Sequence, residues 1–261
     1  EGGLFRKDYK NEDVDKYYMY ATAIPIGTHL AQTFDLDLVR DLGKLVADEM
    51  TEFGIAWWLA PGLNIHRNPL CGRNFEYYSE DPLISGKMAV AITRGVQSHR
   101  RKAVTIKHFA ANNQETNRNA SNSVVSERAF REIYLKGFEI CVREASPKAV
   151  MSSYNLVNGE HTCQIKDLQT YVLRDEWGFD GFVMTDWSVT KGLTKGDKKY
   201  PVAYASGIVK AGNDMTMPGN RNDVMDILKA LEDQRHPYSI TRAQLQLSAK
   251  RILSTILSMC I

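Results

Sequence analysis

Short apolar runs alternate along the chain with longer stretches in which apolar residues recur every three or four positions. The short runs predict buried strands, because strands covered on both faces are almost continuously apolar. The longer stretches predict amphipathic helices. The predicted strands span residues 23–27, 55–64, 103–110, 149–155, 181–187 and 213–219, and the predicted helices span residues 36–53, 83–98, 127–145, 165–177, 202–211, 223–231 and 241–259. This alternation predicts parallel strands joined by helical crossovers.

Polar residues collect at the carboxyl end of most of these runs. They are Asn64 to His66, Lys107 with His108, Tyr154 with Asn155, Asp186 with Trp187, and Met217 with Pro218. An open doubly wound sheet gathers its ligand groups at one switch point, whereas a (β/α)8 barrel builds its site from the ends of many strands. The pattern therefore predicts an α/β fold of the TIM-like barrel type. The barrel is expected to be incomplete, because fewer than eight strands are recognised and at least one would lie before Glu1 or escape the pattern.

The composition favours one domain over residues 1–261. The chain is 43% apolar, which can fill a sizeable core. No linker rich in Pro, Gly or Ser and no repeat of fixed period divides it. The segment before residue 21 is expected to be a loop or leader segment. It begins without Met and without a signal-peptide pattern, and it reads as cut from a longer chain, so location stays open, with the cytoplasm slightly favoured.

Charge and motif content exclude several classes of partner. The net charge is only +2, with no basic block, so neither nucleic acid nor an anionic membrane surface is expected as a partner. No apolar stretch is long enough to span a bilayer. Four cysteines lie far apart and are expected to be free, buried thiols. No histidine pattern for a metal and no glycine-rich phosphate loop is present, so no metal and no cofactor is predicted.

Several long motifs resemble the barrel domain of glycoside hydrolase family 3, the β-glucosidase-type enzymes. In chain order they are "ATAIPIG", "LAPGLNIHRNPLCGRNFEYYSEDP", "IKHFAANNQETNR", "SERAFREIYLKGFE", "VMSSYNLVNGEH", "LRDEWGFDGFVMTDW" and "AGNDMTMPG". The resemblance runs from about Ala21 to Gly219, and residues 241–261 resemble the helix that closes this domain.

Asp186 is the candidate nucleophile. It ends the apolar run "FVMTDW", where a buried carboxylate without a partner or a role would be costly. Taken by itself, it could also be a cap of the following helix. A retaining glycosidase needs one carboxylate as nucleophile and a second carboxyl as acid and then base. The resemblance implies that Asp186 is the nucleophile and that Trp187 stacks beside the sugar.

The resemblance also implies a set of sugar-binding residues. Lys107 and His108 would donate hydrogen bonds to sugar hydroxyls, although alone they could be a solvated charge and a core histidine. Arg118 and Arg73 take the same role, the planar fork of Arg73 suiting two adjacent oxygens. Tyr154 matches a tyrosine near the nucleophile, with ordinary packing as its alternative.

Glu1 matches more loosely. It stands where some family members use an Asp to hold two sugar hydroxyls.

The resemblance implies hydrolysis of terminal non-reducing β-D-glycosyl residues, β-D-glucosyl in particular, from a β-linked glycoside or oligosaccharide. In most family members the acid/base Glu belongs to a second α/β domain, so the expected partner is such a domain or chain outside this sequence. The β-N-acetylglucosaminidase branch is disfavoured, because "KHFAANNQ" lacks its acid/base His. A homo-oligomer is compatible with the sequence.

Two alternatives stay open. One is a non-catalytic sugar-binding barrel or regulatory remnant, which would keep Arg73, Lys107 and His108 but not need Asp186. The weaker one is a barrel enzyme for phosphorylated metabolites, which would want a glycine-rich anion loop near the last strands. The sequence does not reveal which sugar is removed.

Overall fold

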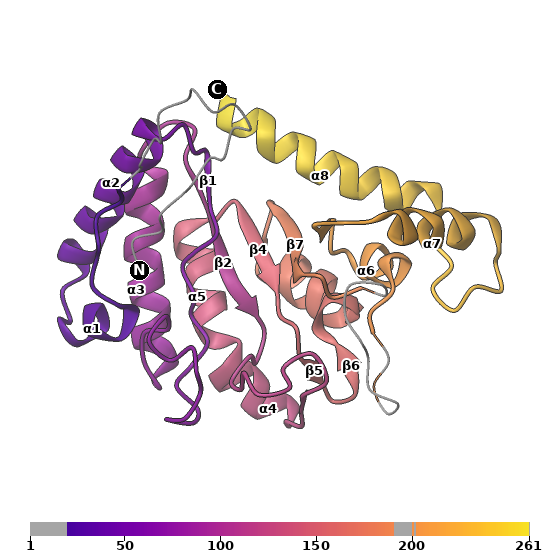
Figure 1. Cartoon of the computed structure of the whole chain (residues 1–261), viewed down its shortest axis with the longest axis horizontal. Helices are drawn as coiled ribbons and strands as arrows, with labels where there is room; N and C mark the ends of the chain where they lie inside the picture. Colours follow the sequence, from indigo (N-terminus) through magenta and orange to yellow (C-terminus); the bar gives the residue numbers. More distant parts are fainter. Residues whose placement is uncertain (1–19, 191–199, 201, 261) are drawn as a thin grey trace, which may run out of the picture.

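Five parallel strands form the central sheet of the protein (Figure 1). The computed structural model of the chain describes residues 20–190, 200 and 202–260. The strands lie in the order β1-β2-β4-β7-β8 and are β1 Trp57–Trp58, β2 Ala103–Phe109, β4 Ala149–Ser152, β7 Phe182–Trp187 and β8 Met215–Met217. Neighbouring strands follow each other along the chain with helical crossovers between them. The sheet is therefore the arc of a barrel, as the alternation predicts.

The helices agree closely with the amphipathic stretches. Their bounds are α1 Gly27–Gln32, α2 Leu36–Glu52, α3 Pro82–Gln97, α4 Glu127–Ala129, α5 Lys136–Ala145, α6 Ala205–Ala211, α7 Arg221–Glu232 and α8 Arg242–Cys260, with π-helical segments η1 Phe130–Tyr134 and η3 Asp167–Glu176 and a 3₁₀ turn η2 Thr162–Gln164. Side-chain caps fix several starts: Asp35 accepts from the first backbone amides of α2, and Asp81 does so for α3. These caps satisfy amides that have no partner inside the helix.

The two faces of the sheet carry different side chains. On the outer face Val104, Ile106, Val150 and Val183 pack with the helices in the largest buried cluster. On the inner face Ala149, Met151, Phe182 and Met184 form a separate cluster, which Ile252 of α8 joins. Alternation along a strand produces this division, since successive side chains point to opposite faces.

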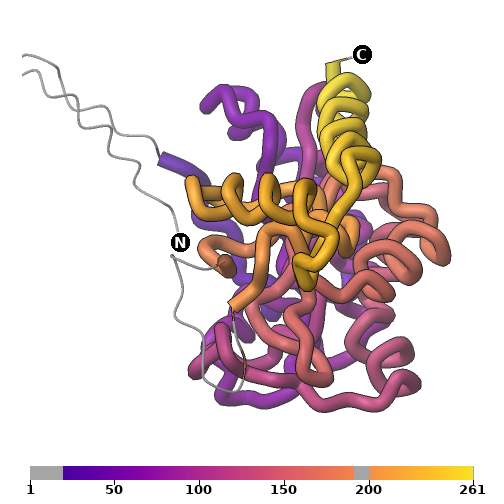
Figure 2. The backbone as a smooth tube through the Cα atoms, turned by 90° about the vertical axis from the view of Figure 1, so that its right-hand side faces the viewer, coloured from indigo at the N-terminus to yellow at the C-terminus, as the bar shows by residue number. Residues whose placement is uncertain are grey.

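Helix α8 lies at the amino ends of the strands (Figures 1 and 2). Its Arg251 donates to the carboxylate of Asp214, directly before β8, at 3.1 Å, and Arg174 of η3 donates to the same carboxylate at 2.6 Å. The carboxyl ends of the strands are thus left clear at the opposite edge of the sheet, which we call the rim.

The structure differs from the sequence predictions in several places, among them the strand predicted over residues 55–64, which is only β1 Trp57–Trp58. Residues 23–26 form no strand and Gly27 begins α1, because this segment is largely exposed and Pro25 has no amide to donate to a sheet. A small sheet of β3 Asn122–Ser123, β5 Leu156–Val157 and β6 Glu160–His161 was not predicted. Its hairpin turns at Asn158 and Gly159, which both have positive φ, the pairing that such turns favour. Cys260 is exposed, whereas the other three cysteines are buried and all four are free, as expected.

Candidate active site

The rim brings together side chains from three neighbouring strands. Lys107 and His108 lie near the end of β2, Tyr154 follows β4, and Asp186 lies near the end of β7. Because β2 pairs with β4 and β4 with β7 in parallel, these positions share one edge. The predicted gathering of polar groups at the carboxyl ends is present in this part of the chain.

A bulge in β2 turns Lys107 and His108 to the same side. Lys107 pairs with Met151 and Phe109 with Ser152, so His108 is one extra residue opposite β4. Phe109 packs on the outer face with Ile106, although regular alternation would place it on the inner face. The regular alternation of faces is therefore interrupted between Ile106 and Phe109, so the side chains of Lys107 and His108 both face the inner side. Bulges commonly redirect side chains in this way.

Asn64 satisfies the backbone groups at this bulge. Its side-chain amide donates to the carbonyl of His108 and its side-chain oxygen accepts from the amide of His108, both at 2.9 Å. The polar end of the run 55–64 therefore fixes the position of His108 from the neighbouring strand segment.

Asp186 is a buried carboxylate, and only one of its two oxygens accepts a hydrogen bond from the described residues. The inner-face alternation of Phe182 and Met184 places it on the inner side of β7, and it is 5% exposed. Its Oδ1 accepts from the backbone amide of Trp187 at 2.7 Å. Its Oδ2 has no hydrogen-bond partner among the described residues, and His108 Nε2 lies 3.6 Å away. A buried charged acceptor in this condition is costly and is typical of functional sites.

Burial raises the pKa of the Asp186 carboxyl above its ordinary value. The hydrogen bond from the amide of Trp187, the positive charges of Arg73 and Arg118, and the hydroxyl of Tyr154 oppose that rise. In return, burial and the nearby charge of Asp186 raise the pKa of Tyr154 to about 12. The phenol therefore keeps its proton near the carboxylate.

Burial, with the positive charges of Arg73, Lys107 and Arg118, lowers the pKa of His108 well below its ordinary value. The imidazole is therefore neutral, with one nitrogen carrying a proton and the other accepting. Its Nδ1 lies 3.1 Å from the hydroxyl of Tyr77.

Two carboxylates hold the basic side chains of the rim in place. Glu76 binds Lys107 at 2.8 Å and Arg73 at 2.6 Å. Burial alone would raise the pKa of Glu76, but the charges and hydrogen bonds of Lys107 and Arg73 keep it below its ordinary value. Glu115 binds Arg118 at 2.7 Å.

The guanidinium of Arg118 also covers the ring of Tyr154, with its central carbon 4.2 Å from the ring centroid. This contact is of the cation–π kind, and it ties the loop after β2 to the loop after β4. Trp187 is 49% exposed at the end of β7, open to a ligand at the rim. Glu1 lies outside the described residues.

Four residues of this site were absent from the sequence-based set. They are Glu76, Tyr77, Asn112 and Glu115. All lie inside the motifs "NFEYY" and "AANNQE", and the available signal was the density of polar residues within segments that follow buried strands. Glu76 and Tyr77 act through contacts with Lys107, His108 and Asn112, more than 30 residues away, which spacing alone does not predict. Glu115 contacts near neighbours in sequence, Asn112 and Arg118.

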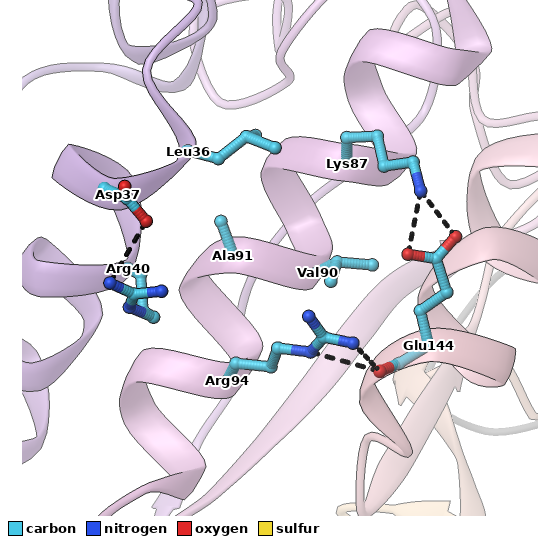
Figure 3. Close-up of a pocket in the computed structure, with 8 residues that line it drawn as sticks. All are labelled: Leu36, Asp37, Arg40, Lys87, Val90, Ala91, Arg94 and Glu144. Carbon is cyan, nitrogen blue, oxygen red and sulfur yellow. Dashed lines mark hydrogen bonds and ion pairs between the residues drawn. The ribbon is translucent and has the colours of Figure 1, made fainter.

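A separate pocket lies among α2, α3 and α5 on the helical layer (Figure 3). Asp37 binds Arg40, Lys87 binds Glu144, and Arg94 donates to the carbonyl of Glu144. Four of its charged side chains thus form two ion pairs, Arg94 is held by a backbone carbonyl, and none of its lining residues belongs to the rim. Over the described ranges, no three His, Cys, Asp or Glu side chains converge as a metal ion would require. None of the helices described is long and apolar enough to cross a bilayer.

Comparison with known proteins identifies relatives of the whole described unit. The family model "Glycosyl hydrolase family 3 N terminal domain" matches residues 9–255. A beta-glucosidase of Ruminococcus albus is 45% identical over 243 residues, which cover 91% of this chain and 25% of the relative. An exo-alpha-(1->6)-L-arabinopyranosidase of Bifidobacterium longum is 48% identical over 167 residues, covering 64% of this chain and 22% of the relative. The chain thus spans about a quarter of the length of these relatives.

Solved structures agree in fold. Beta-glucosidase 3B from Thermotoga neapolitana, in complex with alpha-D-glucose, superposes with a TM-score of 0.84 at 41% identity, covering 96% of this chain and 34% of that one. A GH3 beta-glucosidase from Bifidobacterium adolescentis superposes with a TM-score of 0.80 at 37% identity, covering 97% of this chain and 34% of that one. The predicted TIM-like α/β fold, incomplete as a barrel in the described residues, is confirmed.

Proposed function

Because this chain belongs to glycosyl hydrolase family 3, we propose that it carries the nucleophile and the sugar-binding groups of a retaining β-glycosidase. The favoured substrate is a terminal, non-reducing β-D-glucosyl residue of a glycoside or oligosaccharide. The observation that supports this most is the buried Asp186 carboxylate, whose Oδ2 has no hydrogen-bond partner in the described chain and lies beside several donors.

Asp186 attacks the anomeric carbon of the sugar through Oδ2. The glycosidic bond breaks as the new carbon–oxygen bond forms, through an oxocarbenium-like transition state, and a covalent glycosyl-enzyme results. Water, which gives a proton to the acid/base group, then attacks the same carbon and releases Asp186 as a carboxylate. The amide of Trp187 holds the other carboxylate oxygen throughout and so fixes the direction of attack.

The basic side chains of the rim bind the sugar hydroxyls. Arg73 and Lys107 share Glu76 and present their remaining N–H groups to the ligand. His108, beside Asp186, and Arg118, over the ring of Tyr154, donate to the sugar, and Trp187 offers an aromatic face to the ring. Preorganised donors near the reacting carbon strengthen as charge develops there.

The acid/base comes from a segment outside the described rim. Glu76 is held as a carboxylate by Lys107 and Arg73, so it has no proton to give. Glu115 is engaged by Arg118 and Asn112. We assign the acid to a second domain or chain that contacts the rim, as the large uncovered share of the relatives' length allows.

The identity of the sugar is the finer part of the proposal. The relatives carry the names of a glucosidase and of an arabinopyranosidase, and an arabinopyranose lacks the hydroxymethyl group of glucose. A panel of nitrophenyl glycosides that includes both sugars tests the choice. We expect the glucoside to have the higher kcat/KM; a higher value for the arabinopyranoside would reassign the substrate.

Labelling of Asp186 tests the mechanism directly. A dinitrophenyl deoxyfluoroglucoside needs little help from an acid, because its leaving group departs without a proton, and its fluorine slows the second step. We expect one sugar per chain, located on the peptide that carries Asp186 by mass spectrometry. Asp186→Ala should abolish the label, and Asp175→Asn, which removes an exposed carboxylate of η3, should keep it.

The same experiment separates catalysis from simple sugar binding. A non-catalytic barrel would bind glucose, with or without Asp186, and would take up no label. A folded chain that binds sugar but is never labelled at Asp186 would contradict the proposed nucleophile.

A further inference from the structure

A chain of polar groups, partly buried at Arg118 and Glu115 and buried from Asn112 onward, connects Arg118 to Asp186. Arg118 donates to Glu115 Oε2 at 2.7 Å, and Asn112 donates from Nδ2 to Glu115 Oε1 at 3.0 Å. A carboxylate held by an arginine can only accept hydrogen bonds. The amide of Asn112 must therefore turn its nitrogen, not its oxygen, toward Glu115.

That orientation fixes the hydroxyl of Tyr77. The same Nδ2 of Asn112 lies 3.0 Å from the Tyr77 oxygen, so the amide donates and the hydroxyl accepts. Tyr77 is fully buried, and among the described residues its hydroxyl has one further hydrogen-bond partner, His108 Nδ1 at 3.1 Å. A buried hydroxyl proton without an acceptor would cost about 1 to 3 kcal/mol. The proton therefore points at Nδ1.

From this geometry we propose that Tyr77 is a positioning residue that sets the tautomer of His108. By donating to Nδ1, it places the imidazole proton on Nε2, the nitrogen that faces Asp186 Oδ2 at 3.6 Å. The inference deepens the proposed function, on which it rests: His108 presents an N–H to the nucleophile and to an approaching sugar oxygen. The opposite tautomer would turn a lone pair toward the carboxylate, which repels it.

The tautomer can be measured without any substrate. Imidazole ¹⁵N chemical shifts distinguish a protonated from an unprotonated ring nitrogen. In the natural polypeptide that carries this sequence, we expect His108 to be neutral at pH 7, with the proton on Nε2. A proton on Nδ1, or on both nitrogens, would overturn the proposal.

The variant Tyr77→Phe removes the hydroxyl and keeps the ring. We expect the ¹⁵N shifts of His108 to move toward a mixture of tautomers, and the rate constant for labelling of Asp186 to fall about tenfold, as for one hydrogen bond lost in the transition state. The matched control is Tyr78→Phe, the adjacent buried tyrosine, which packs in the outer cluster. It should leave both the shifts and the rate unchanged.

The variant Glu115→Gln tests the control of the His108 tautomer in a second way. It replaces one carboxylate oxygen by an N–H donor, and with the remaining oxygen held by Arg118 that donor faces Asn112. The Asn112 amide can then turn its oxygen toward this donor and toward Tyr77, and compete for the hydroxyl proton. The His108 shifts should again move toward a mixture, and unchanged shifts in both variants would refute the role of Tyr77. If instead the tautomer responds as expected while Asp186 is never labelled, the proposed function fails and the positioning by Tyr77 stands.

Discussion

At the scale of single residues, the rim is a compromise between stability and chemistry. Asp186 is desolvated, and only one of its two oxygens accepts a hydrogen bond from the described residues. Lys107 and Arg73 are also largely buried, but Glu76 compensates both. The uncompensated charge is therefore confined to the one carboxylate that we propose as the nucleophile, where stored free energy would serve the reaction.

Replacing Asp186 by Asn should stabilise the protein at neutral pH. Burial raises the pKa of Asp186 in the folded state, so the folded state keeps its proton to higher pH than the unfolded chain does. Stability consequently falls as pH rises between the ordinary pKa and the folded one, and the full cost is present above both. Asn avoids the charge, and we expect a gain on the order of 1 kcal/mol, or about 2 to 4 °C in Tm.

Thermal unfolding of the wild-type protein and of the Asp186→Asn variant, measured over a range of pH, checks the expected gain in stability. The gain should shrink as pH falls through the folded pKa, because the wild-type carboxyl then becomes neutral too. Asp175→Asn is the control for removing a negative charge at an exposed site. A variant less stable than wild type at pH 7 would show that the Asp186 carboxylate is better compensated than its contacts indicate.

Residue types at the rim were predictable, but their directions were not. Lys107, His108 and Asp186 stand out in the sequence as polar groups that end apolar runs. The bulge that turns both β2 residues inward depends on pairing with β4, and Asn64 stabilises it from another segment. A carboxylate such as Glu76 is recognisable as a structural partner only once its cations are seen beside it.

At the scale of elements, the closest packing is between α2 and α3. A β-carbon at Gly95 would lie 2.1 Å from the carbonyl oxygen of Arg40 and 2.8 Å from the α-carbon of Gly43. One at Gly43 would lie 2.6 Å from the carbonyl oxygen of Ile92. The two helices can approach this closely only because glycine faces glycine where they cross.

Gly95→Ala should force these two helices apart. Overpacking of this kind costs about 1 to 3 kcal/mol, and replacing glycine by alanine in a helix gains about 1 kcal/mol in propensity. Because the β-carbon here would meet backbone atoms, which cannot move aside as a side chain can, we expect the upper end of the cost and a net loss of stability. We expect a lower midpoint in urea unfolding. Gly137→Ala is the matched control, because the nearest atom to a β-carbon there, the carbonyl oxygen of Pro82, is 3.4 Å away.

That control should be neutral or slightly stabilising, since alanine restricts the unfolded chain. If the unfolding midpoint of Gly95→Ala equalled that of Gly137→Ala, helices α2 and α3 would be able to move apart without a loss of stability, and the prediction would be wrong.

Helices were predicted better than strands for a physical reason. An amphipathic stripe marks a helix along its whole length, and the stripe over residues 36–53 matches α2 Leu36–Glu52 almost residue for residue. Strands are defined by partners, so the run 55–64 yields only the short β1 Trp57–Trp58. The run 23–27 has the composition of a strand but none of the described strands pairs with it.

At the scale of the whole molecule, stability and chemistry lie at opposite ends of the sheet. At the amino ends, Arg174 and Arg251 form ion pairs with the buried Asp214, which connect η3 and α8 to the sheet. At the rim, the ends of β2 and β7 and the loops that follow the strands carry the groups that we propose for binding and reaction. This separation lets rim residues change with little effect on the closure by α8, as in barrels generally.

The rate at which the 261-residue chain alone hydrolyses a glycoside should depend steeply on the pKa of the leaving group. The described carboxyls near Asp186 are ion-paired, so a departing alkoxide receives no proton from them, and general acid help is worth about 10²- to 10⁴-fold. We expect dinitrophenyl glucoside to be hydrolysed and alkyl glucosides to react at least about 10²-fold more slowly. Initial rates against leaving-group pKa measure this dependence.

A flat dependence would contradict the assignment of the acid to another segment. In that case a carboxyl of this chain itself would have to be the proton donor. Glu76→Gln, which should leave the slope unchanged, is the informative companion variant.

The sequence by itself determined the alternation of strands and helices, the edge where polar groups gather, and the family whose motifs it shares. These properties depend on residue types and on spacing along the chain. Only the tertiary structure decided which way Lys107 and His108 face, which charges neutralise each other, and how protons are shared along the line from Arg118 to His108. Side-chain direction follows the register between strands, and the state of an ionisable group follows burial and neighbours brought from distant segments, so neither is a property of any one stretch of sequence.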